Sequence, residues 1–141
     1  MSEQAEVLKA RAKRFALDIL KIIKHLPLEE PGPTIRRQLA KSATSTSMNF
    51  RATCRARSHA EFTAKIGLVA EEADETLGWL ETVDEAGLLT KPELLEELKR
   101  LLREADELTA IFSGSAGTAR RNERLKRDQS ATRRGSQSPN H

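Results

Sequence analysis

Several residue types that define common protein classes are scarce in this chain. The 141 residues include one cysteine, Cys54, one tryptophan and no tyrosine. A single cysteine excludes an internal disulfide and favours the cytoplasm. No stretch approaches the roughly 18 apolar residues of a membrane span, and the N-terminus, MSEQAEVLKA, lacks a signal peptide's apolar run. We therefore expect a soluble cytoplasmic protein with no membrane partner.

Groups for catalysis and metal binding are equally scarce. The three histidines share no spacing that would gather them into one site. Glu71, Glu72 and Glu75 resemble part of a carboxylate di-metal site, but such sites need a Glu-x-x-His motif on two helices, and the chain has none. A glycine-rich phosphate loop is also missing. We expect no catalytic residue, no metal and no cofactor, and hence no enzyme.

Charge, in contrast, is abundant and unevenly distributed. Residues 1–57 hold 12 Lys/Arg against 5 Asp/Glu, a net charge of +7. Residues 58–112 hold 5 against 14, a net charge of −9, and residues 113–141 hold 7 against 2, a net charge of +5. The chain thus has a basic part, an acidic part and a basic tail, a pattern that predicts an anionic partner or pairing between subunits.

Four segments have the apolar spacing of amphipathic helices, with proline and glycine confined mainly to the connections. The predicted helices cover about residues 5–26, 34–57, 58–83 and 90–112. Helices of this length with short connections predict an all-α fold, an antiparallel up-and-down four-helix bundle over residues 1–112. Residues 113–141 form an Arg/Ser-rich tail that we expect to be mostly disordered, from about residue 120 onward.

Helix starts are marked by capping signals. Thr34 is a plausible cap for the second helix. Ser58 and Glu61 form a capping box, in which each side chain satisfies a backbone donor of the other, at the start of the third. Thr90 and Glu93 repeat that signal before the fourth, with Pro92 tolerated in a first turn.

The second predicted helix has two opposite faces at 100° per residue. Its apolar face carries Ile35, Leu39, Ala43, Thr46, Phe50 and Cys54. Its other face carries Arg37, Lys41, Thr44, Met48, Arg51 and Arg55. A solvated basic face is the common explanation of such a stripe, but the neighbouring basic residues make contact with nucleic-acid phosphates the alternative. Because aromatic residues are few, backbone-directed binding is expected rather than base stacking.

Two further residues leave their roles open. Cys54 lies on the apolar side of the second helix, where a small buried hydrophobic residue is commoner than a nucleophile. Trp79 is either an anchor between subunits or ordinary packing at the edge of the core.

A combined pattern across this sequence resembles that of a known bacterial family. It consists of an Arg-bearing helix, a small-residue stretch, Asn, then Arg-Ser-x-x-Glu-Phe and an acidic helix with a Trp-Leu pair. The residues that carry it are Arg36, Arg37, Gln38, Leu39, Asn49, Arg57, Ser58, Glu61, Phe62, Glu72–Glu75, Trp79 and Leu80. The sequence resembles the four-helix-bundle proteins of 23S rRNA intervening sequences, in one superfamily with the accessory variability determinant of diversity-generating retroelements.

The resemblance implies a ring-shaped homopentamer without enzymatic activity. For the retroelement branch it also implies association with a reverse transcriptase and with nucleic acid through a basic surface. We interpret Asn49, Phe50 and Trp79 as residues of the oligomer interface. The predicted nucleic-acid-binding residues are Arg36, Arg37, Lys41, Arg51, Arg55, Arg57, Arg120 and Arg121.

Two functional hypotheses follow. The first is a non-enzymatic oligomer that binds the RNA or DNA backbone through its basic face, as an accessory to a reverse transcriptase or an rRNA-associated element. The alternative is a scaffolding homo-oligomer whose basic and acidic parts pair between subunits, without nucleic acid.

Overall fold

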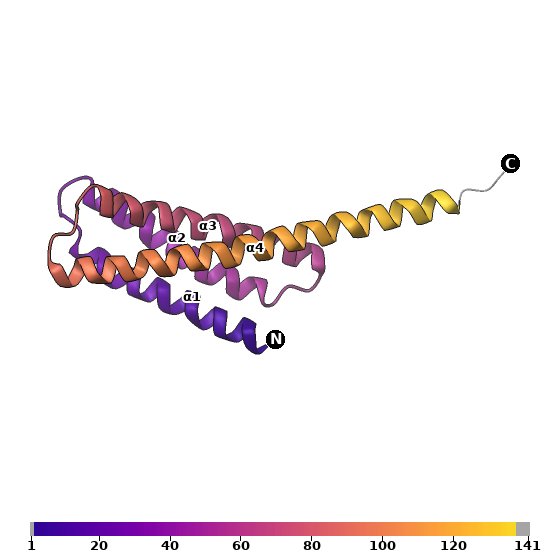
Figure 1. Ribbon diagram of the computed structural model, residues 1–141, viewed down its shortest axis with the longest axis horizontal. Coiled ribbons are helices and arrows are strands. Elements are labelled where there is room, and N and C mark those ends of the chain that lie inside the picture. The colour runs from indigo at the N-terminus through magenta and orange to yellow at the C-terminus, as the bar shows by residue number, and fades with distance from the viewer. Residues whose placement is uncertain (1, 138–141) are drawn as a thin grey trace.

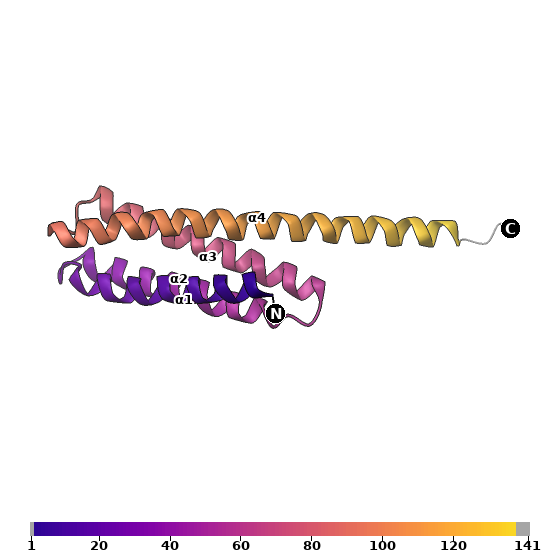
Figure 2. The same cartoon turned by 60° about the horizontal axis from the view of Figure 1, so that its bottom comes forward.

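The computed structural model describes residues 2–137, which form helices and short connections without a strand (Figure 1). The elements are α1 (Glu3–Ile22), the 3-10 turn η1 (Ile23–His25), α2 (Gly32–Thr53), α3 (His59–Glu85) and α4 (Pro92–Ser136). Successive α-helices run in opposite directions, as Figures 1 and 2 show. The predicted all-α, antiparallel up-and-down bundle is confirmed. None of the described helices is long and apolar enough to cross a membrane.

The second helix, α2, begins two residues earlier than the sequence predicted. Thr34 was predicted as the cap, but α2 starts at Gly32 with Pro31 at the N-cap position. Gly32 packs so closely that a Cβ atom there would lie 1.7 Å from the carbonyl oxygen of Pro27. The prolines on either side have no N–H to lose, so the first turn of a helix accommodates them. Thr34 therefore lies inside the helix.

The start of α3 confirms the predicted cap in part. The hydroxyl of Ser58 accepts a hydrogen bond from the backbone N–H of Glu61, at 3.1 Å. The Glu61 carboxylate accepts from the backbone N–H of Arg57, at 3.3 Å, rather than from that of Ser58. At α4 the predicted cap is wrong, because Lys91 occupies the N-cap position without a side-chain hydrogen bond and Pro92 opens the helix.

The core is formed by one apolar face of each helix. At its centre the rings of Phe50 in α2 and Phe112 in α4 lie 5.1 Å apart at a tilt of 44°. Ion pairs at the edge of the core connect α1 to α4: Arg100 lies 2.7 Å from Asp18, and Arg11 pairs with Glu104. Since Asp18 is buried, its charge needs this partner.

The fourth helix is longer than predicted. The bundle was expected to end at residue 112, but Ala116 and Ala119 are also buried and continue the spacing of Phe112 along α4. Their small side chains within a Ser/Gly-rich stretch gave only a weak apolar signal. From residue 120 to Ser136, where disorder was expected, the chain forms an exposed helix that projects beyond the bundle (Figures 1 and 2). The expected disorder of residues 138–141 falls outside the described residues.

Candidate nucleic-acid interface

The two faces predicted for α2 are confirmed by burial. The residues predicted for its apolar face are buried from Ile35 to Phe50, and Cys54 is half-buried. Arg37, Lys41, Met48, Arg51 and Arg55 are exposed, and Thr44 is half-buried. One side of α2 therefore packs in the core while the other presents four cations to solvent.

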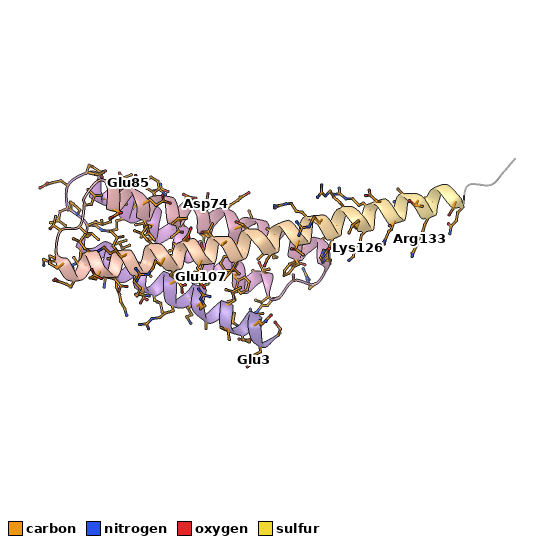
Figure 3. The ribbon with its side chains drawn as sticks, in the orientation of Figure 1. Glu3, Asp74, Glu85, Glu107, Lys126 and Arg133 are labelled. Atoms are coloured by element: carbon orange, nitrogen blue, oxygen red, sulfur yellow. The ribbon has the colours of Figure 1, made fainter. Side chains whose placement is uncertain are left out.

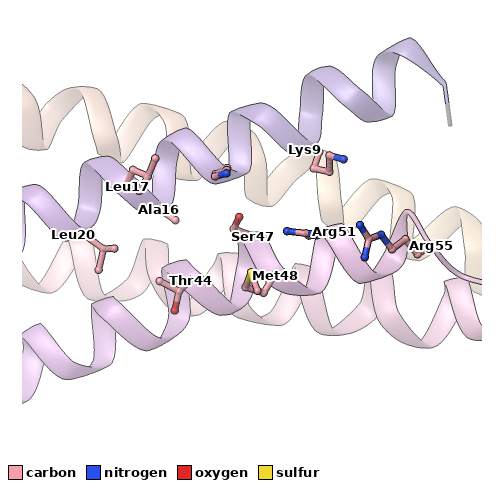
Figure 4. Close-up of a pocket in the computed structure, with 10 residues that line it drawn as sticks. Lys9, Ala16, Leu17, Leu20, Thr44, Ser47, Met48, Arg51 and Arg55 are labelled. Atoms are coloured by element: carbon pink, nitrogen blue, oxygen red, sulfur yellow. The ribbon is translucent and has the colours of Figure 1, made fainter.

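The exposed face of α2 forms one wall of a groove, and α1 forms the other (Figure 4). This α1–α2 groove has a volume of about 450 Å³. Its lining residues are Lys9, Lys13, Ala16, Leu17, Leu20, Thr44, Ser47, Met48, Arg51 and Arg55. Lys9 and Lys13 were not among the predicted binding residues. Their spacing of four residues, which places them on one helix face, is the sequence signal that could have identified them.

Charge in this groove is poorly balanced by the chain itself. Lys13, Arg51 and Arg55 form no salt bridge with a carboxylate of the described residues. Lys9 lies 3.5 Å from Glu6 of its own helix. In Figure 4 Lys9, Arg51 and Arg55 gather toward one end of the groove, and Leu17 and Leu20 toward the other. The groove is thus cationic at one end and apolar at the other.

Arg37 and Lys41 lie nearer the start of α2. Arg37 donates a hydrogen bond to the hydroxyl of Thr34, at 3.3 Å. Lys41 acts on Glu72 in α3, where burial raises the pKa of the carboxyl, Glu75 raises it further and Lys41 lowers it. One oxygen of Glu72 is buried without a hydrogen-bond partner within the described chain. This end of the basic face therefore borders an acidic helix.

Arg36 has a structural role instead of the predicted role in nucleic-acid binding. Its Nε donates to the carbonyl oxygen of Ile23, and its terminal nitrogen donates to that of Leu26, both at 3.1 Å. The carbonyl oxygen of Ile23 also accepts from the backbone N–H of Leu26, at 3.2 Å, so Arg36 adds a charged donor where the chain leaves the first helix. Arg36 therefore does not belong to the free cationic face.

The other predicted cations lie at the far end of the bundle. Arg57 is exposed and lies 3.7 Å from Glu61. Arg120 and Arg121 are exposed and line a hollow of about 650 Å³ between α4 and the first turns of α3. Arg124 and Arg127, which the sequence analysis counted only as part of the tail, line the same hollow.

The three predicted interface residues differ in exposure. Phe50 is 5% exposed and packs on Phe112, so it belongs to the core of a single chain and offers no surface to another subunit. Asn49 is half-buried. Trp79 is half-buried against the core, and its Nε1 donates to Glu75 at 3.5 Å. Only Asn49 and Trp79 retain surface for a contact.

Among residues 2–137, no three His, Cys, Asp or Glu side chains are placed to share a metal ion. Burial raises the pKa of the Cys54 thiol, which disfavours the nucleophilic thiolate. His59 faces the carbonyl oxygen of Ala119 at 3.4 Å and Glu123 at 3.6 Å, contacts that join α3 to α4.

Comparison with known proteins assigns this chain to a family. Residues 3–114 match the family described as 23S rRNA-intervening sequence protein. The chain belongs to this family. Membership confirms the resemblance to the 23S rRNA intervening-sequence proteins, and the family description names rRNA and no catalytic activity. The match ends near residue 114, so most of the exposed part of α4 lies outside what defines the family.

One solved structure supports the same assignment for this family member. A crystal structure from Bacteroides thetaiotaomicron VPI-5482, described as a protein with unknown function from the S23 ribosomal protein family, is 26% identical. The similarity covers 77% of this chain and 97% of that chain, with a TM-score of 0.67. Among curated proteins, none matches.

Proposed function

We propose that this family member binds the phosphate backbone of RNA through the α1–α2 groove and has no catalytic activity of its own. The observation that carries the proposal is the convergence of Lys9, Lys13, Arg51 and Arg55 on one groove. Three of them have no carboxylate partner among residues 2–137. Cations that the protein does not neutralise are available to release counterions from a nucleic acid, which is the main source of such binding.

Further cations extend the proposed surface along the bundle. Arg37 and Lys41 continue the exposed face of α2, and Arg57, Arg120 and Arg121 lie at the end where α2 passes into α3. RNA is favoured over DNA because the family description names 23S rRNA. The binding is expected to be salt-dependent and weakly sequence-specific, since neither groove nor tail offers aromatic stacking platforms.

Charge reversal tests this proposal. The variant Arg51→Glu/Arg55→Glu should bind a labelled RNA duplex about 100-fold more weakly at low salt, because each lost charged contact accounts for roughly tenfold. The matched control is Lys24→Glu/Lys91→Glu, which reverses two exposed cations at the opposite end of α1 and at the start of α4. Equal affinities for the two variants would refute a role for the groove.

A second function is favoured by a different observation. Met48 is 62% exposed and Leu17 43% exposed in the same groove, and such apolar side chains suit a protein surface better than phosphates. Residues 58–112, with a net charge of −9, offer a complementary surface on another copy of the chain. In this scaffolding alternative, high salt or the same charge reversal dissociates the oligomer, which light scattering would detect as a fall in mass.

The remaining parts of the proposal come from the family resemblance. A homopentamer is the proposed assembly, with Asn49 and Trp79 as its surface contacts. A reverse transcriptase is the proposed protein partner if this member belongs with the retroelement accessory proteins, and its cellular site is proposed as the cytoplasm. Sedimentation of the purified protein tests the subunit number. A reverse transcriptase gene beside this one would support that partner.

A further inference from the structure

The exposed end of α4 is a separate structural element. This α4 extension, residues 120–136, contains no buried residue and projects past the bundle as a single helix (Figures 1 and 2). It carries 7 Lys/Arg against 2 Asp/Glu, a net charge of +5. In Figure 3 the labelled Lys126 and Arg133 stand on this rod, away from the acidic Asp74 and Glu85 over the bundle. The extension therefore presents an exposed, strongly cationic surface that suits an anionic partner.

Arginines follow one line along the extension. At 100° per residue, four of them fall within about 80° of the circumference and extend over about 21 Å of helix. This Arg stripe consists of Arg120, Arg124, Arg127 and Arg134. Lys126 and Arg133 lie on the opposite side of the helix. B-form DNA rises about 3.4 Å per base pair along its axis, so the stripe spans the axial length of about six base pairs.

The base of the Arg stripe lies in a corner of the fold. Arg120, Arg121, Arg124 and Arg127 line the hollow of about 650 Å³ whose other wall is the first turns of α3. Glu123 also lines this hollow, and its carboxylate lies 3.6 Å from His59. The N-terminus of a helix favours negative charge, which adds to the attraction of the four guanidinium groups. Within the described chain, none of the seven cations of the extension forms a salt bridge.

The residue types of the extension restrict its partner. Leu125 is its only large apolar side chain, so it has no apolar face to enter a membrane or pack on a protein. The last aromatic residue of the chain is Phe112, which leaves the extension without rings to stack on unpaired bases. Binding to a regular array of phosphates requires neither an apolar face nor aromatic rings.

We propose that the Arg stripe binds phosphates of a double-stranded nucleic acid, with the nearest phosphate seated in the corner between α3 and α4. This inference rests on the proposed nucleic-acid function but assigns it a second element, outside the family match. Arginines three and four residues apart repel each other on a helix, and a short isolated helix is marginal in water. Phosphates relieve that repulsion, so binding should increase the helicity of the extension.

The test compares two full-length variants that lose the same charge. Arg124→Gln/Arg127→Gln removes two residues of the stripe, and Lys126→Gln/Arg133→Gln removes two from the other side of the same helix. Binding of each to labelled RNA and DNA duplexes is titrated with salt. We expect the stripe variant to bind about 10- to 100-fold more weakly and to lose about 1.8 from its salt slope, at roughly 0.9 for each phosphate. The control variant should keep the slope of the wild-type protein.

The outcomes separate this inference from the proposed function. If both variants lose the same slope, the extension acts by net charge alone and the stripe is refuted. If neither loses slope while Arg51→Glu/Arg55→Glu does, the groove binds nucleic acid and the extension does not. If the wild-type protein binds no duplex, both proposals fail.

A fall in oligomer mass for the stripe variant, with duplex binding unchanged, would instead assign the stripe to subunit contact. Comparison of the two duplexes distinguishes RNA from DNA, and far-UV circular dichroism should show a helical gain with the wild-type protein.

Discussion

Arg36 in α2 donates a hydrogen bond from Nε to the backbone carbonyl oxygen of Ile23 in η1, at 3.1 Å, and so ties the end of α1 to the next helix. Substitution Arg36→Gln should therefore lower the free energy of unfolding by about 1–3 kcal/mol, since buried acceptors lose a charged donor. Arg37→Gln, which alters the exposed neighbour, should cost far less. Urea unfolding measures both. A destabilisation shared equally by the two variants would contradict the structural role of Arg36.

A second prediction concerns the aromatic pair in the core. Phe50→Ala should reduce the free energy of unfolding by about 3–5 kcal/mol, because it leaves a cavity beside Phe112. Trp79→Ala, at a half-buried site, should cost less stability and, if the interface proposal holds, should reduce the oligomer mass at low concentration. Thermal unfolding together with light scattering separates the two effects. A Phe50 variant that dissociates while keeping the stability of each chain would return this residue to the interface.

Two glycines predict opposite responses to the same substitution. Gly32→Ala places a methyl group on the Pro27 backbone and should destabilise the protein by about 1–3 kcal/mol. Gly78 in α3 is exposed with open space around it, so Gly78→Ala should stabilise the helix by roughly 0.5–1 kcal/mol. Melting temperatures measured side by side test the pair. Two shifts of the same sign would contradict the packing described around Gly32.

The sequence predicted the bundle well because the apolar period is regular over four segments, although only the cap at Ser58 lies where the sequence placed it. Phe15, Leu39 and Phe112 each belong to an apolar stripe with helical spacing on their own helix, and all three are buried. The α1–α2 groove was only half predictable, because spacing on α2 shows which residues share a face but not which residues of α1 lie across from them. Arg36 was misassigned for a related reason: its partners are backbone carbonyl groups, which no pattern of side chains reveals.

The pH dependence of stability should report on Glu72. In the folded state, burial raises the pKa of this carboxyl above its ordinary value of 4.5. The folded protein therefore holds the proton of Glu72 more tightly than the unfolded chain does. Its contribution to stability is fully present below pH 4.5 and is lost as pH rises through the higher folded pKa. Glu72→Gln should therefore gain stability relative to the wild-type protein as pH rises through that window. The exposed Glu81→Gln, which removes a carboxylate that does not act on Glu72, serves as the control. A Glu72→Gln difference that stays flat with pH would contradict the buried environment.

Binding of nucleic-acid phosphates by the α1–α2 groove is tested most directly by removing the competing cations of the α4 extension. A chain truncated after Ala119 keeps every residue that is buried in the bundle. Its affinity for a labelled RNA duplex should be titrated with salt. We predict that the truncated chain still binds and that log K falls with log salt at a slope of roughly −3 to −4, about 0.9 for each of the four groove cations. A truncated chain that no longer binds, while the full-length protein does, would contradict the claim and assign the binding to the extension alone.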